Sequence, residues 1–125
     1  ELSEKKVFIV DTVGLLSKIY NYADIAYVGG GMGSSGLHNI LEAAVFGVPI
    51  IIGKNFSKFP EAKELMNLGG LISIDSAASF SSALNTFVED MEFREKSGEK
   101  NKAYIEKNTG ASSTILKAIG LLLKD

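Results

Sequence analysis

The fold of this chain is constrained most by four short apolar runs that do not alternate with polar residues. They occupy residues 7–10, 25–28, 49–52 and 71–74. Strands of a parallel sheet read as continuous apolar runs, because helices cover both faces of the sheet. The four runs therefore predict four buried, parallel β-strands.

The segments between the runs carry apolar residues at helical spacing, at residues 15–20, 40–45 and 62–66. Glycines stand where these helices are expected to end, at Gly47 and at the pair Gly69-Gly70. Alternating strands and helices predict an α/β fold: a Rossmann-like, three-layer α/β/α domain with a doubly wound parallel sheet of about four strands. The ligand site of such a sheet lies beyond the carboxyl ends of its strands.

A last helix is expected from about residue 111 to residue 124. Its apolar residues cover more of its circumference than one buried stripe requires. Two interpretations stay open: a helix that packs on another part of a longer protein, and a well-buried terminal helix.

The composition fits a single domain over residues 1–125, with 46% hydrophobic and 22% charged residues. A net charge of -2 with scattered lysines argues against a nucleic-acid partner. The chain has no cysteine and one histidine, which excludes thiolate and multi-histidine metal sites. Four strands are few for such a sheet, and Glu1 to Lys6 do not resemble a signal peptide. We therefore expect a piece of a longer protein.

A glycine-rich loop follows the second expected strand, from Gly29 to Gly36. Glycines let the backbone approach a ligand closely, and loop amides next to a helix N-terminus favour a phosphate. The alternative is a flexible connection, since the spacing matches neither the Walker motif nor a dinucleotide fingerprint. The candidate phosphate-binding residues of this loop are Gly30, Gly31, Ser34, Ser35 and Gly36.

Three polar residues follow this loop at the start of the next helix. Asn39 and Glu42 are three residues apart and share one helix face, so the carboxylate of Glu42 is a candidate partner for ribose hydroxyls. Its alternative role is a first-turn glutamate favoured by the helix dipole. His38 is a candidate hydrogen-bond donor to a phosphate, or alternatively a structural cap of the loop.

Two further segments follow expected strands at the same edge of the sheet. Val13 and Gly14, in the segment 11–14, are candidates to face a nucleobase, whereas Asp11 or Thr12 could instead begin a helix. Lys54 follows the third strand and is a candidate to neutralise phosphate charge, although surface lysines are usually only solvated.

Taken together, these segments resemble the Kdo (3-deoxy-D-manno-octulosonic acid) transferases, which have the GT-B glycosyltransferase fold. The resemblance runs from Val7 to about Asp90. It is carried by Asp-Thr-Val-Gly at 11–14, Ala-Asp-Ile-Ala-Tyr-Val-Gly-Gly at 23–30, Gly-Leu-His-Asn-Ile-Leu-Glu at 36–42, Phe-Gly-Val-Pro at 46–49 and Phe-Pro-Glu-Ala at 59–62. It implies the C-terminal, donor-binding half of such an enzyme.

The resemblance also implies a donor, an acceptor and a location. The donor is CMP-Kdo, the acceptor is a lipid A precursor in lipopolysaccharide synthesis, and the location is the cytoplasmic face of the bacterial inner membrane, with peripheral association through the parent protein. The general base is expected in the N-terminal half, so this chain is expected to hold no catalytic residue and to be inactive alone. No metal and no cofactor are expected either.

The implied contacts place Val13 and Gly14 near the base, Gly30 to Gly36 with His38 and Asn39 near the phosphate, and Glu42 at the ribose. The sequence departs from the usual pattern at Leu15, Ala43 and Lys54, where many members carry Glu, Pro and Pro. These departures bear on donor selectivity. The alternatives are another GT-B enzyme, a UDP-sugar epimerase domain, or a non-catalytic nucleotide-binding module.

Overall fold

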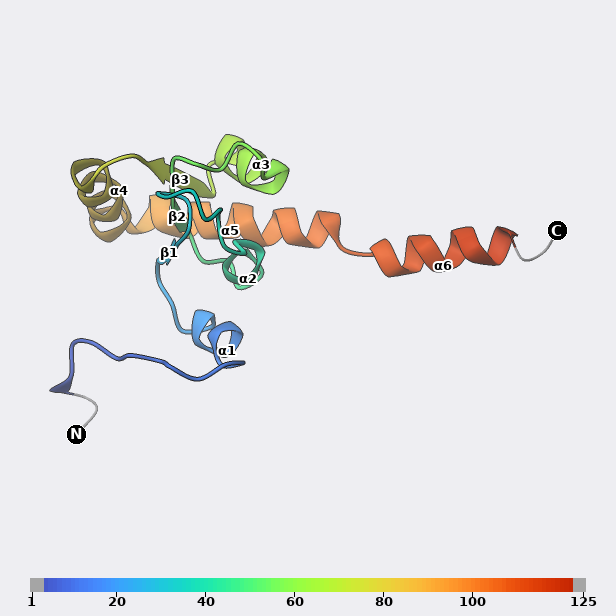
Figure 1. The fold of residues 1–125 in the computed structure, drawn as a ribbon, viewed down its shortest axis with the longest axis horizontal. Helices are drawn as coiled ribbons and strands as arrows, with labels where there is room; N and C mark the ends of the chain where they lie inside the picture. Colours follow the sequence, from blue (N-terminus) through green and yellow to red (C-terminus); the bar gives the residue numbers. More distant parts are fainter. Residues whose placement is uncertain (1–3, 123–125) are drawn as a thin grey trace.

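A computed structural model describes residues 4–122 of the chain. Its centre is a three-stranded parallel sheet in the order β1-β2-β3, formed by Ala26–Val28, Ile50–Gly53 and Leu71–Ile74 (Figure 1). Ile51 of β2 lies between Tyr27 of β1 and Ile72 of β3. Three of the four predicted strands are therefore confirmed within a residue of their expected bounds, and their parallel pairing is confirmed as well.

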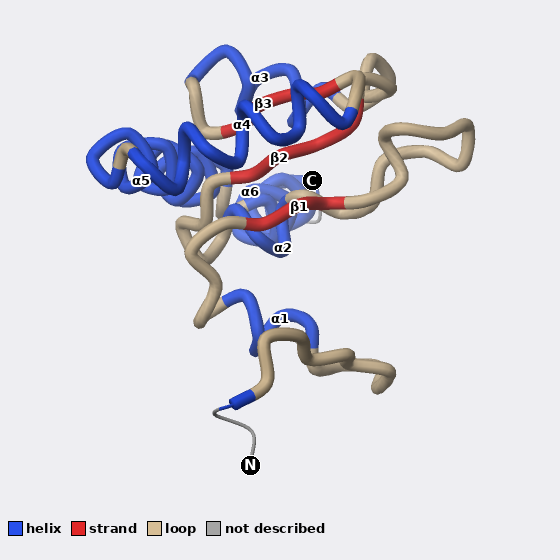
Figure 2. The backbone as a smooth tube through the Cα atoms, turned by 90° about the vertical axis from the view of Figure 1, so that its left-hand side faces the viewer, coloured by secondary structure: helices blue, strands red, loops and turns tan. Residues whose placement is uncertain are grey.

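The predicted strand at residues 7–10 is wrong for this structure. The segment has no strand conformation, and Val7, Phe8 and Ile9 are 77%, 73% and 82% exposed. Figure 2 shows it beyond α1 (Leu16–Tyr20), on the side away from the sheet. A strand is stable only when a neighbour accepts its backbone hydrogen bonds, and no described segment does so here. The described strands also lie in simple sequence order, without the reversal that a doubly wound sheet has.

Helices cover both faces of the sheet, which confirms the three-layer α/β/α prediction. On one face, α2 (Leu41–Ala44) and α3 (Pro60–Leu68) bury Ala44 and Leu65 against Ile50 and Ile52. On the other face, α4 (Ala77–Glu89) buries Phe87 against Ile51. Because neighbouring residues of a strand point to opposite faces, the continuous run of β2 supplies both cores.

Local signals set the ends of these helices. Pro60 occupies the first turn of α3, and Gly69 ends the helix in the left-handed conformation, at φ +83°. Ser76 and Ser79 form a reciprocal capping box at the start of α4. The Asp90 side chain accepts a 2.8 Å hydrogen bond from Phe93 N and begins α5 (Met91–Asn108).

The long helix α5 is attached to the sheet by Asn101, which is fully buried. Asn101 Nδ2 donates to Val48 O at 2.7 Å and to Gly70 O at 2.8 Å. Both acceptors lie just before a strand, so Asn101 connects the amino ends of β2 and β3. The carboxyl ends of the strands are left free for a site.

The last helix, α6 (Ala111–Leu122), extends away from the other elements (Figure 1). The prediction of a helix here is confirmed, and residues 123 and 124 lie outside the described part. The interpretation as a well-buried terminal helix is wrong for this structure, since Ile115 and Leu116 are 57% and 69% exposed. Packing on another part of a longer protein stays a prediction. No described helix combines the length and the apolar character that crossing a membrane requires.

Candidate functional site

The candidate site lies where β1 and β2 end and their loops meet. The backbones of Gly31 and Gly53 touch here: a Cβ added to Gly53 would lie 2.2 Å from the carbonyl carbon of Gly31. No side chain fits at that distance, so glycine is required at position 53. The glycine-rich loop after β1 is thereby held against the end of β2.

Asn55 connects the same two loops. Its backbone N–H donates to Gly31 O at 2.8 Å, and its Nδ2 donates to Gly33 O at 3.0 Å and to Met32 O at 3.4 Å. Sequence reasoning did not select Asn55. Its position directly beyond a strand end, where a side-chain amide can reach a neighbouring loop, was the available signal.

The glycine-rich loop also closes on itself. His38 N donates to Gly29 O at 3.0 Å, and a Cβ on Gly30, whose φ is +88°, would lie 2.0 Å from Gly36 O and 3.0 Å from His38 Cδ2. Gly30 therefore permits a close approach that no other residue allows. The exposed His38 ring lies beside Gly29 and Gly30, at the base of the loop.

The two loops enclose a pocket of about 310 Å³, here named the glycine-loop pocket. It brings together three residues predicted from sequence, Ser34, Gly36 and Lys54. Its lining residues are Gly33, Ser34, Gly36, Lys54, Asn55, Ser57, Lys58 and Phe59. Of the other predicted loop residues, Gly31 is buried beneath the loop, and Ser35 is exposed and lines neither this pocket nor the next one.

A second pocket, of about 710 Å³, lies between α1 and the start of α2 and is here named the Glu42 pocket. It brings Val13 and Gly14 together with Glu42, as predicted from sequence. Val13 lines this pocket and is 99% exposed, so its side chain is open to solvent. The lining residues are Val10, Thr12, Val13, Gly14, Leu16, Ser17 and Glu42.

Asn39 orients Glu42 within this pocket. Asn39 Nδ2 donates to Glu42 Oε1 at 3.1 Å, and Asn39 Oδ1 accepts from Leu41 N at 3.1 Å. Burial, together with the charge of Glu42, raises the pKa of the nearby Tyr20 hydroxyl. Glu42 thus exposes carboxylate oxygen to the pocket while the amide of Asn39 fixes its direction.

Asp75 lies at the carboxyl end of β3, on the same edge of the sheet. Ser79 Oγ donates to Asp75 Oδ1 at 3.0 Å. Hydrogen bonds from Ser79 and Ser76, with a smaller contribution from the charge of Lys54, hold the pKa of this carboxyl below its usual range. Within residues 4–122 no group of three or more His, Cys, Asp or Glu side chains is placed to hold a metal ion.

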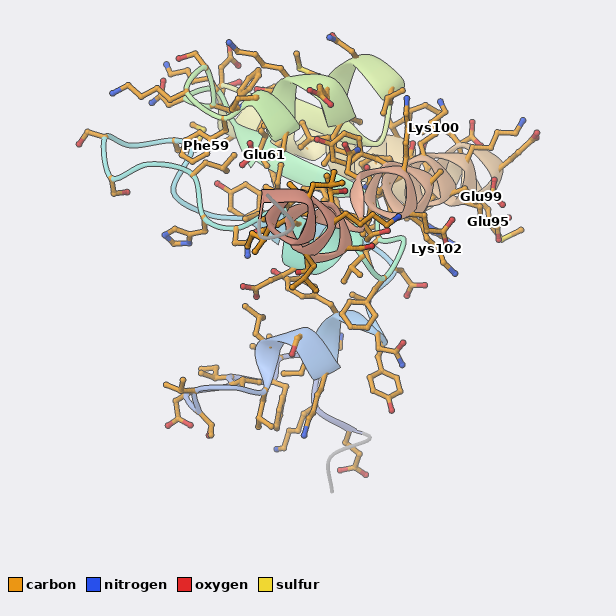
Figure 3. The ribbon with its side chains drawn as sticks, turned by 90° about the vertical axis from the view of Figure 1, so that its right-hand side faces the viewer. Phe59, Glu61, Glu95, Glu99, Lys100 and Lys102 are labelled. Carbon is orange, nitrogen blue, oxygen red and sulfur yellow. The ribbon has the colours of Figure 1, made fainter. Side chains whose placement is uncertain are left out.

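A third pocket, of about 440 Å³, lies between α3 and α5 and includes Glu64, Lys100 and Tyr104. It contains none of the residues predicted from sequence. Figure 3 shows the charged α5 side chains, such as Glu95, on the opposite side of the view from Phe59, which lines the glycine-loop pocket. We therefore assign the candidate site to the glycine-loop and Glu42 pockets.

Comparisons with known proteins found curated relatives and a similar solved structure. No family model matches the chain. It is 33% identical over 113 residues to a 3-deoxy-D-manno-octulosonic acid transferase of Haemophilus influenzae, covering 89% of this chain and 26% of that protein. It is 31% identical over 108 residues to the enzyme of the same name from Aquifex aeolicus, covering 83% of this chain and 31% of that protein. The chain thus spans only about a quarter to a third of the curated relatives that it matches.

A solved structure shares the fold. It is the crystal structure of the C-terminal CMP-Kdo binding domain of WaaA from Acinetobacter baumannii, with a TM-score of 0.74 and 22% sequence identity. The match covers 82% of this chain and 54% of that one. The match shows that this chain shares the fold of that domain.

Proposed function

Because this chain is homologous to the 3-deoxy-D-manno-octulosonic acid transferases, we propose that it is the donor-binding domain of such a glycosyltransferase. Its donor is CMP-Kdo, and the parent enzyme transfers Kdo to a lipid A precursor at the cytoplasmic face of the inner membrane. The observation that carries this proposal is the placement of Glu42, oriented by Asn39, in one pocket with Val13 and Gly14.

The Glu42 pocket suits the nucleoside. A carboxylate accepts hydrogen bonds from both hydroxyls of a ribose, as an acidic residue does in other nucleotide sites of parallel sheets. Thr12 to Gly14 present backbone to the flat face and edge of a base. The asparagine amide holds one carboxylate oxygen of Glu42, which leaves the remaining lone pairs for the ligand.

The glycine-rich loop suits the phosphate. Gly33 and Gly36 of this loop line the glycine-loop pocket, and Asn39, three residues after the loop, donates to Glu42 of the Glu42 pocket. Its backbone can approach a ligand closely, and its amides, Ser34 and His38 are hydrogen-bond donors for an anion. Phosphate oxygens held here are stabilised as negative charge develops on the departing CMP.

The reaction itself divides between two parts of the enzyme. A base outside this chain takes the proton of the acceptor hydroxyl, whose oxygen attacks the anomeric carbon of Kdo. The bond from that carbon to the phosphate oxygen breaks, and CMP leaves with the electron pair. The residues of this chain hold the nucleotide and stabilise the leaving phosphate, so the isolated chain is expected to bind the donor without transferring it.

Calorimetric titration of the chain with CMP, UMP and UDP tests this proposal. We expect CMP to bind most tightly, and Glu42→Ala to weaken it about 10- to 100-fold, since a hydrogen bond to a charged group is worth about 1.5 to 3 kcal/mol. Glu95→Ala, on the exposed face of α5, is the matched control and should bind CMP normally. A preference for UDP would point to another GT-B enzyme or an epimerase domain, and an absence of nucleotide binding would overturn the proposal.

A further inference from the structure

We propose that the glycine-loop pocket binds the carboxylate of the donor sugar, and that Lys54 and Lys58 are the residues that select an acidic sugar. The inference rests on the proposed function, because it assigns a second part of the same donor. It goes beyond that function by assigning recognition of the sugar to residues other than those that recognise the nucleotide.

The first argument is the contrast in charge between the two pockets. The glycine-loop pocket is lined by two lysines and by no carboxylate. The Glu42 pocket is lined by one carboxylate and by no lysine. An anionic group is attracted to the first pocket and repelled by the second, whereas a neutral ribose meets an acceptor in the second. The charges therefore give the bound donor one direction.

The second argument is that both lysines are free to bind an anion. Among the residues that the structure describes, the one ion pair joins Lys96 to Glu92, on α5. Lys54 is near enough to Asp75 to affect its titration, but it forms no ion pair with it. Two unpaired ammonium groups at one small pocket repel each other, and a bound anion relieves that repulsion.

The third argument is the number of negative charges on the donor. The phosphate of a CMP-sugar is a diester with a single charge, for which the loop amides and His38 are the donors proposed above. The related enzymes are named for an octulosonic acid, a sugar that carries a carboxylate of its own. Two lysines beyond the loop match this second anion. Ser34 and Ser57 add hydroxyls that can donate to the carboxylate or to the sugar.

The fourth argument is that the pocket is preorganised. Asn55 holds the carbonyls of Met32 and Gly33, so the wall formed by the glycine-rich loop is tied to the wall formed by the loop after β2. Lys54 directly follows Gly53, whose backbone touches Gly31. The stem of Lys54 thus leaves a part of the backbone that is held in place, which lowers the entropy lost when its ammonium group binds a ligand.

The test compares CMP with freshly prepared CMP-Kdo as ligands of the 125-residue chain, by calorimetry. We expect the unmodified chain to prefer CMP-Kdo. In Lys54→Ala/Lys58→Ala that preference should fall by about tenfold or more, with the dissociation constant of CMP unchanged within about twofold. Lys54→Arg/Lys58→Arg should keep most of the preference, because the positive charges remain. Lys100→Ala/Lys102→Ala, on α5, removes the same charge elsewhere and should change neither affinity.

The remaining outcomes separate the two proposals. If the lysine double variant loses affinity for CMP and CMP-Kdo equally, the lysines bind the phosphate and the carboxylate subsite is wrong. If the variant keeps its preference for CMP-Kdo, the subsite is also wrong, while the nucleotide-binding function stands. If the unmodified chain binds neither ligand, the proposed function itself fails. Circular dichroism of every variant confirms that the fold is intact.

Discussion

Asn39 and Glu42 act as one unit at the start of α2, joined by a 3.1 Å hydrogen bond from Asn39 Nδ2 to Glu42 Oε1. The oxygen of the same amide, Asn39 Oδ1, accepts from the N–H of Leu41, the first residue of α2. α2 has only four residues, so this bond and the burial of Ala43 and Ala44 hold it in place. Asn39 therefore both contacts the start of the helix and aims the carboxylate.

Asn39→Asp separates these two functions. The aspartate keeps an acceptor for Leu41 N but loses the donor to Glu42 and places a second negative charge beside it. We expect the dissociation constant of CMP to rise about three- to tenfold, with little change in the thermal midpoint. Asn21→Asp, in the exposed turn after α1, adds the same charge outside the Glu42 pocket and should leave CMP binding unchanged. Equal behaviour of the two variants would contradict the role given to Asn39.

Asn101→Ala should destabilise the fold by about 2 to 3 kcal/mol, measured by urea unfolding. The change leaves Val48 O without this donor, whereas Gly70 O keeps a 3.2 Å bond from Ile50 N. Asn108→Ala is the matched control, because Asn108 donates only to Tyr104 O on the exposed side of its own helix. It should cost less than about 0.5 kcal/mol. An unaltered CMP affinity in folded Asn101→Ala would fit its location at the amino ends of the strands.

Gly53→Ala should affect both stability and binding. The new methyl group would lie 2.2 Å from the Gly31 carbonyl carbon and 2.4 Å from Met32 N, so the two loops have to separate. We expect the free energy of unfolding to fall by about 1 to 3 kcal/mol and the affinity for CMP-Kdo to weaken. Gly120→Ala, in α6 with no atom within 4 Å of the added carbon, should instead be neutral or slightly stabilising. Normal stability of Gly53→Ala would show that the loops are not in contact.

The carboxyl of Asp75 should titrate below its ordinary pKa of 3.8, because Ser79 and Ser76 donate to it. A folded pKa below the unfolded value means that these hydrogen bonds stabilise the folded chain above pH 3.8 and that their contribution is lost as the pH falls through the folded pKa. Ser79→Ala should raise the Asp75 pKa toward its ordinary value, as followed by NMR of the side-chain carboxyl carbon. Ser82→Ala, elsewhere on α4, should not shift it.

The predictable part of the fold is the part specified by residues that are close together in the sequence. β2 and β3 follow from continuous apolar runs, and the end of α3 follows from Gly69. The run at residues 7–10 has the same composition but no strand partner among the described residues. Whether an apolar run becomes a strand depends on what lies beside it, which its own residues do not specify.

That some of the candidate residues lie together was predictable, but their division between two pockets was not. The ends of β1 and β2 bring Lys54 to the glycine-rich loop, as expected from the edge of a parallel sheet. Val13 lines one pocket with Glu42 although no strand precedes it. That these groups line two pockets of opposite charge depends on contacts between distant segments. Asn55 meets Gly33 across 22 positions of sequence, and its place beyond a strand end does not specify which carbonyl it contacts.

The two hydrogen bonds of Asn101 also bear on the order in which the chain can fold. They join residues 53 and 31 positions apart, so neither can form until the chain has been made through the middle of α5. During synthesis, all three strands leave the ribosome before Asn101, the residue that connects the amino ends of β2 and β3. Closing such long loops costs entropy that only the finished contacts recover. The nascent sheet is therefore expected to stay open and exposed to chaperones until α5 emerges, and mutations at Asn101 should lower the yield of folded protein more than they affect its affinity for ligand.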